Sequence, residues 1–151
     1  MVDEESLLRK LHVENIELAS INKRAFAMFI DEMIISFLFF FIIQDHLSAL
    51  TTPEEVVAYT QSLMIYVLII KVLYQALFVG MYGATLGKMA MKIKVVDQDY
   101  LDIPSRSAST IRAVMRVVSE MLFYFGFVVA LFSPLKLTWH DKFAKTLVVD
   151  A

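Results

Sequence analysis

The sequence predicts a small all-α integral membrane protein. We expect two full transmembrane helices, a third hydrophobic helical unit that re-enters or spans the membrane, and a small cytoplasmic β-hairpin or sheet. Hydrophobic residues make up 58% of the 151 residues, above the roughly 45–50% of soluble domains. They are concentrated in long blocks, and the mean hydropathy is +0.64. Two shorter runs, "KVVD" and "LVVD", are typical of strands because they are rich in β-branched residues.

The first 22 residues are mixed and acidic, and we expect them to form a cytoplasmic N-terminal segment. They show no basic start followed by an apolar core, and no small-residue cleavage site. A cleavable signal peptide is therefore not expected. Residues 23–151 are expected to form one membrane domain.

Three membrane segments are predicted, at about residues 25–43, 63–81 and 112–134. The first two match the roughly 20 apolar residues that a spanning helix needs. The third becomes continuously apolar only after Glu120 and ends at Pro134. Lys and Arg are absent from the stretch between the first two segments but occur before the first and after the second. This asymmetry predicts a cytoplasmic N-terminus in the cell inner membrane.

The runs "MKIKVVD" (91–97) and "AKTLVVD" (144–150) are expected to pair in one small sheet. Such pairing requires both runs on the same side of the membrane. The third segment would then enter and leave on the inner side, with a bend near Gly126. The alternative is a plain third span with the C-terminus outside.

Two carboxylates, Asp31 and Glu32, interrupt the first apolar segment. A charge at such depth costs at least about 2.5 kcal/mol, so it should face protein or water. Either an ion pair that holds helices together or a proton or cation site would explain them. Arg24 lies seven residues before Asp31 and therefore on the same helix face. Lys71 and Gln75 share a face of the second segment, and Lys71 is a candidate partner for the two acids.

Further charges lie near the third segment. Arg112, Arg116 and Glu120 are spaced by four and share one helix face. We expect Arg112 to meet lipid phosphate, and Arg116 and Glu120 to pair or to reach Asp31. Lys88 follows "GATLG", which lacks the phosphate-loop pattern. Nucleotide binding is therefore not expected there, and Lys88 should meet anionic headgroups.

The segment "TWHDKFAKT" contains His140 beside Asp141. One adjacent pair is weak support for a metal site, which needs more ligands, and the chain has no cysteine. Asp141 suits the start of a helix. No nucleophile elbow or dinucleotide fingerprint occurs, so we expect no enzyme activity, cofactor or metal. With a net charge of −2, we expect no nucleic-acid partner.

Three segments, "RAFAMFID", "GATLGKMAMKIKVVD" and "WHDKFAKTLVV", occur in this order within about residues 20–150. Together they resemble the RDD family of prokaryotic membrane proteins. The resemblance implies that Arg24, Asp31 and Asp141 are the name-giving arginine and aspartates. It also makes Arg24 and Asp141 a candidate pair on the cytoplasmic side. Transport is suspected in this family, and cation/proton exchange is proposed for some members.

The resulting functional hypothesis is a membrane transport protein of unknown ligand. Cation/proton exchange would use Asp31 as the titrating site. The alternative is a structural or regulatory subunit whose charges hold helices or partners together. Besides the lipid bilayer, we expect a homo-oligomer or another membrane protein as partner. The candidate ion, proton or ion-pair residues are Arg24, Asp31, Glu32, Lys71, Gln75 and Asp141, with Arg116, Glu120 and His140 in addition.

Overall fold

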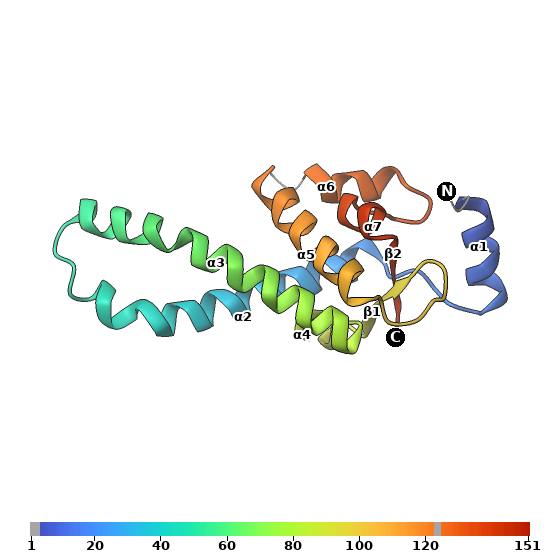
Figure 1. The fold of residues 1–151 in the computed structure, drawn as a ribbon, viewed down its shortest axis with the longest axis horizontal. Coiled ribbons are helices and arrows are strands. Elements are labelled where there is room, and N and C mark those ends of the chain that lie inside the picture. Colours follow the sequence, from blue (N-terminus) through green and yellow to red (C-terminus); the bar gives the residue numbers. More distant parts are fainter. Residues whose placement is uncertain (1–3, 123–124) are drawn as a thin grey trace.

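A computed structural model describes residues 4–122 and 125–151. The chain is mostly helical and elongated, with one long helical hairpin and a compact end that holds the other elements (Figure 1). The elements are α1 (Glu4–Val13), α2 (Ile21–Leu47), α3 (Pro53–Tyr82), α4 (Leu86–Ala90), β1 (Ile93–Asp97), α5 (Arg106–Met121), α6 (Phe125–Val128), the 3-10 helix η1 (Val129–Phe132), α7 (Trp139–Ala144) and β2 (Thr146–Asp150).

The ends of α2 and α3 are fixed by local capping. Ser20 precedes α2, and its side chain accepts a hydrogen bond from the Lys23 amide. Thr52 and Glu55 form a capping box at the start of α3, which satisfies amides that have no partner inside the helix. Gly83 ends α3 with φ 69°, a left-handed conformation that suits glycine.

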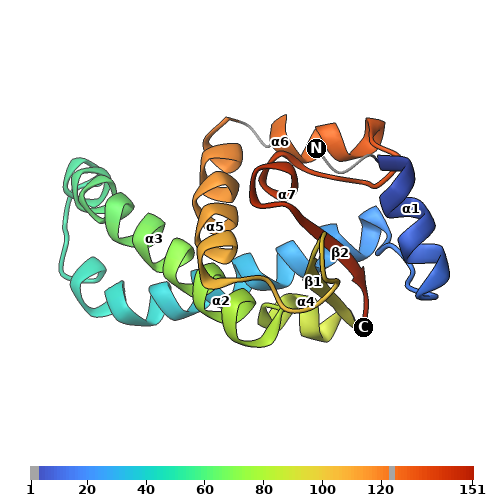
Figure 2. The same cartoon turned by 45° about the vertical axis from the view of Figure 1, so that its right-hand side comes forward.

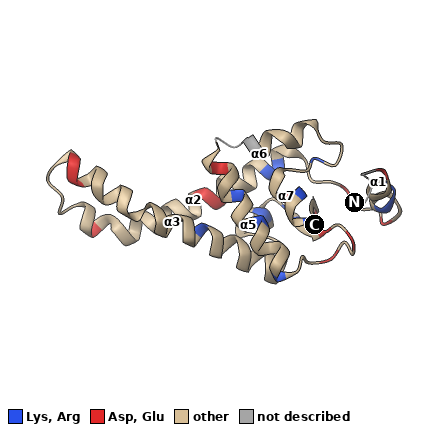
Figure 3. Ribbon diagram, turned by 45° about the horizontal axis from the view of Figure 1, so that its top comes forward, with Lys and Arg blue, Asp and Glu red and all other residues tan. Residues whose placement is uncertain are grey.

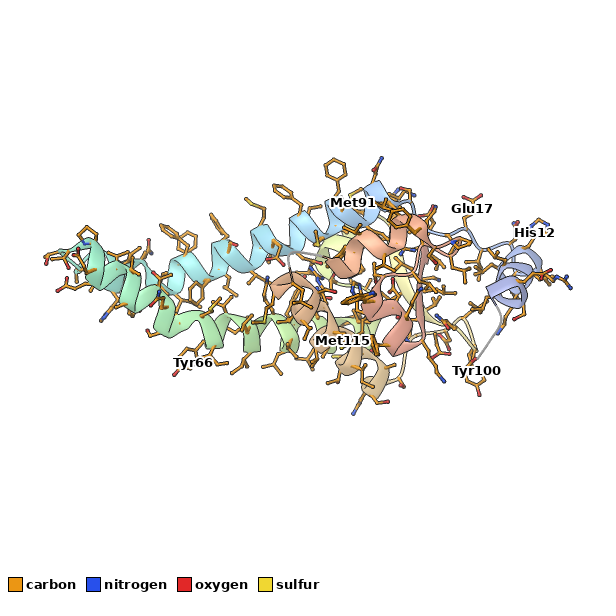
Figure 4. All side chains as sticks on the ribbon, turned by 90° about the horizontal axis from the view of Figure 1, so that it is seen from above. His12, Glu17, Tyr66, Met91, Tyr100 and Met115 are labelled. Atoms are coloured by element: carbon orange, nitrogen blue, oxygen red, sulfur yellow. The ribbon has the colours of Figure 1, made fainter. Side chains whose placement is uncertain are left out.

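Helices α2 and α3 are long and apolar enough to cross a membrane, with mean hydropathies of 2.3 and 2.1 over their most apolar stretches. Only 17% and 11% of these stretches are buried within the protein, so most of their apolar side chains face outward. Figure 4 shows side chains along the hairpin, Tyr66 among them, pointing outward. Both helices extend beyond the predicted segments 25–43 and 63–81 because polar residues at their ends are also helical.

The predicted small sheet is confirmed. Strands β1 and β2 pair antiparallel, from Ile93 opposite Asp150 to Asp97 opposite Thr146. Val149 of β2 also forms a bridge with Leu18, so β2 lies between β1 and the segment before α2. Figure 2 shows this sheet at the same end of the hairpin as α1.

The third hydrophobic segment is divided among several short elements. Helix α5 ends at Met121, α6 begins at Phe125, and η1 ends at Phe132. Within residues 4–122 and 125–151, only α2 and α3 qualify as candidate spans. The bend predicted near Gly126 adjoins residues 123 and 124, which lie outside the described residues.

Helix α1 was not anticipated from the sequence. Its apolar residues Leu7 and Leu11 are 3% exposed and join a core cluster with Leu135, Leu147 and Val149. The N-terminal segment therefore packs against the C-terminal third of the chain.

Candidate functional site: a buried charge network

A dense group of buried and partly buried charged side chains lies where α2, α3, α4, α5 and α7 meet. Figure 3 shows basic and acidic positions on α2, α3 and α5 in this region, whereas the far tip of the hairpin is acidic. Five cations and four carboxylates form the network: Arg24, Lys71, Lys88, Arg112 and Arg116, with Asp31, Glu32, Glu120 and Asp141.

Asp31 is fully buried and surrounded by donors. Its Oδ1 accepts hydrogen bonds from the Tyr74 hydroxyl and the Gly87 amide, both at 2.8 Å. Its Oδ2 accepts one from the Thr85 hydroxyl at 2.7 Å, and Arg116 Nη1 lies 3.8 Å away. These contacts join α2, through Asp31, to α3, α4 and α5.

Gly87 is required for this contact because α4 approaches α2 very closely. A Cβ atom at Gly87 would lie 2.1 Å from the Ala27 carbonyl oxygen and 2.8 Å from Asp31 Oδ1. Thr85 precedes α4 and also accepts a bond from the Lys88 amide at 3.4 Å. The "GATLGK" segment thus presents an amide and a hydroxyl to Asp31.

Lys71 is held between two carboxylates. Its Nζ atom lies 2.8 Å from Glu32 and 2.6 Å from Glu120. Arg116 contacts the same acids, at 3.5 Å and 3.0 Å. The structure therefore brings Lys71 to Glu32 rather than to Asp31. Gln75 is 5% exposed, and its Nε2 has no hydrogen-bond partner among the described residues.

Asp141 forms a second centre, at the start of α7. Its carboxylate is paired with Arg112, lies 3.5 Å from Arg24, and accepts bonds from the Thr138 amide and hydroxyl. Burial disfavours its charge, but Arg112, Arg24 and Thr138 outweigh burial and hold the pKa of Asp141 well below its ordinary value. Burial also lowers the pKa of His140 well below its ordinary value, so His140 is neutral.

Arg24 and Asp31 belong to different parts of the network. Arg24 donates to the Lys136 carbonyl at 2.6 Å and the Val148 carbonyl at 2.9 Å, besides contacting Asp141. The structure thus brings together the Arg24–Asp141 pair that the sequence suggested. Arg116, which lies near Asp31, extends from α5 between the two centres.

Two predicted contacts with lipid headgroups are wrong. Arg112 and Lys88 are buried, with 4% and 8% exposure. Arg112 is buried because α5 directs Arg112 and Arg116 inward, and Lys88 is buried because it belongs to α4, which packs closely against α2. Helix α5 therefore does not present these arginines to headgroups. Its exposed face is instead apolar, with Ile111 47% and Val114 44% exposed.

Two uncharged residues that bind the network are not predicted by the sequence analysis. Tyr74 and Thr85 both donate to Asp31. The only available signal was that Tyr74 lies three residues after Lys71, and so near it on α3. Within the described part of the chain, no three His, Asp or Glu side chains gather closely enough to hold a metal ion.

Comparisons with known proteins place the chain in a family. Searches among curated proteins and among solved structures gave no significant match. The RDD family model, in contrast, matches residues 18–145. This region contains Arg24, Asp31 and Asp141, which the structure places in the buried charge network. Because the match covers well over half of its length, the chain belongs to the RDD family.

Proposed function

We propose that this chain is a membrane transport protein that exchanges a proton for a small monovalent cation. The exchange site consists of Glu32 and Glu120 around Lys71. The observation that carries the proposal is the position of the Lys71 ammonium, 2.8 Å and 2.6 Å from the two carboxylates. Two carboxylates that hold one ammonium ion provide the charge and the oxygen atoms that a monovalent cation needs.

The surroundings of Glu32 support exchange. The Glu32 side chain is 29% exposed, whereas that of Glu120 is 9% exposed. Glu32 Oε1 has no hydrogen-bond partner among the described residues, although Arg116 lies 3.5 Å away. An oxygen with spare acceptor capacity can take a proton or a cation when Lys71 withdraws. Arg116 would remain to balance the charge of Glu120.

Asp31 has a different part in this proposal. Three hydrogen bonds and the nearby Arg116 already occupy its oxygen atoms. A cation would have to displace these donors. We therefore assign the titrating role to Glu32, and Asp31 fixes the helices around it.

The proposed topology has α2 and α3 spanning the inner membrane with the N-terminus in the cytoplasm. Support comes from the absence of Lys and Arg in residues 44–62, at the far tip of the hairpin. The third segment would enter and leave on the cytoplasmic side, since β2 pairs with β1 and bridges to Leu18. Two spans are few for a transport pathway, so the working unit would be an oligomer.

The test is cation and proton flux in proteoliposomes that contain the full chain. Glu32→Gln would keep the size of the side chain and remove its charge. Glu54→Gln is the matched control, because Glu54 is exposed at the tip of the hairpin. We expect wild type and Glu54→Gln to exchange Na⁺ or K⁺ for protons, and folded Glu32→Gln to lose the exchange. Equal flux in folded Glu32→Gln would refute the assignment, and no flux in wild type would refute transport.

A structural or regulatory subunit is the second candidate function. The observation that favours it is the arrangement around Asp31, which joins four helices through fixed hydrogen bonds and an ion pair. This function predicts that Asp31→Asn and Glu32→Gln reduce assembly with partners. It predicts no flux in any variant.

A further inference from the structure

A second site lies away from the Lys71 group, in a small cavity beside α4 and α7. The cavity has a volume of about 40 Å³. A single water needs about 10–15 Å³, so the space suits one monatomic ion with a water or two. Its polar lining consists of Arg24, Lys88, Arg116, Thr138, His140 and Asp141.

The charge of the lining is positive. Three cations, Arg24, Lys88 and Arg116, face one carboxylate, Asp141. The oxygens of Asp141 are already bonded to Arg112 and Thr138 and lie near Arg24. Lys88 forms no ion pair among the described residues, and its Nζ has a single long contact of 3.4 Å, with the Thr85 hydroxyl. A buried ammonium without a counter-ion is costly.

Unused polar atoms at the cavity point to the same kind of ligand. Arg24 Nε and His140 Nδ1 are buried and have no hydrogen-bond partner among the described residues. Arg24 Nε is always a donor, and neutral His140 can carry its proton on Nδ1. The site therefore has surplus donors and positive charge, whereas a cation site would need surplus oxygen atoms.

We propose that this cavity binds a small monovalent inorganic anion, such as chloride, with Lys88 as its principal counter-ion. Over the whole network five cations face four carboxylates, so one bound anion completes the balance of charge. The proposal does not depend on cation exchange at Glu32, since the two sites use different lysines.

Anion binding should be linked to the proton on Lys88. Burial lowers the pKa of Lys88 to about 7, and Arg116 and Arg112 add to this effect. A bound anion favours the protonated form, so its affinity should fall as the pH rises above about 7. The charged and titratable groups around Lys88 are Arg24 and Asp31 of α2, Arg112 and Arg116 of α5, and His140 and Asp141 of α7.

Chloride NMR line width on the purified full chain in detergent tests the proposal. We expect saturable broadening with wild type, stronger at about pH 6 than at about pH 8.5. Lys88→Met should weaken binding by about tenfold or more, as expected for loss of a charged hydrogen-bond partner. Lys94→Met, at an exposed position in β1, is the matched control and should bind as wild type does.

A second measurement uses the wild-type protein alone and therefore tests the proposal even if Lys88→Met does not fold. Thermal unfolding of wild type in sodium chloride is compared with unfolding in sodium gluconate at equal ionic strength. Chloride should raise the Tm, because a ligand that binds only the folded state stabilises it. Equal Tm values in the two salts, or unchanged chloride broadening in folded Lys88→Met, would overturn the proposal.

Discussion

Replacing Gly87 by alanine tests whether the close approach of α4 to α2 determines stability. The new Cβ atom would lie 2.1 Å from the Ala27 carbonyl oxygen and 2.9 Å from Asp31 Cγ. To reach ordinary contact, the carbonyl oxygen and α4 must separate by about 1 Å. That movement breaks the 2.8 Å hydrogen bond from the Gly87 amide to Asp31.

The expected magnitude follows from three contributions. Strain from overpacking costs about 1–3 kcal/mol, and a lost hydrogen bond to a charged group costs about 1.5–3 kcal/mol. Alanine is a better helix former than glycine, which returns about 1 kcal/mol. The free energy of unfolding should therefore fall by about 3 kcal/mol, and the Tm by roughly 10 °C.

The assay is thermal unfolding of the purified chain in detergent, followed by circular dichroism. Gly80→Ala is the matched control, because a Cβ atom there would lie 3.5 Å from the Ser109 side chain, an ordinary contact. We expect this control to unfold at or slightly above the wild-type temperature, because alanine is the better helix former within α3 as well. If Gly87→Ala also unfolds at the wild-type temperature, the close approach described here does not hold Asp31 in place.

Two further predictions concern the second half of the network. Arg112→Gln should lower the free energy of unfolding by about 3–5 kcal/mol, because it leaves Asp141 buried without its main partner. Chemical denaturation measures this change, with exposed Arg106→Gln as the control. An equal decrease in the two variants would contradict the importance of the Arg112–Asp141 pair. In gluconate, the free energy of unfolding should rise with pH between about 7, the folded pKa of Lys88, and its ordinary 10.5, because the unfolded state holds one more proton. The slope of the free energy of unfolding against pH should approach about 1.4 kcal/mol per pH unit. If wild type and Lys88→Met show the same slope, Lys88 is not the group responsible.

The elements whose residues follow a local pattern could be predicted from the sequence. Apolar length predicted α2 and α3, and the β-branched VVD runs predicted the pairing of β1 with β2. Spacing by four also predicted that Arg116 and Glu120 lie together, as their 3.0 Å contact shows. These features depend on local periodicity, which a sequence displays directly.

Contacts between distant segments were harder to predict. Charged residues on one helix face have the same spacing whether they contact lipid headgroups or a buried partner. The spacing alone therefore does not show that Arg112 is buried. Its partner Asp141 lies 29 residues away on another helix. The burial of Lys88 is equally hard to predict, because nothing in "GATLGK" indicates that α4 packs closely against α2.

The position of β2 between β1 and residues 17–19 has a consequence for biogenesis. Arg24 emerges from the ribosome 117 residues before Asp141, and Arg112 emerges 29 residues before it. Both long helices, α2 and α3, are therefore complete before Asp141 is made, and Arg24 lacks its carboxylate throughout their synthesis. Closing so long a loop carries an entropic cost, and β2 closes it by joining the early and late segments. The compact end of the molecule is then completed late, after both long helices have been synthesised.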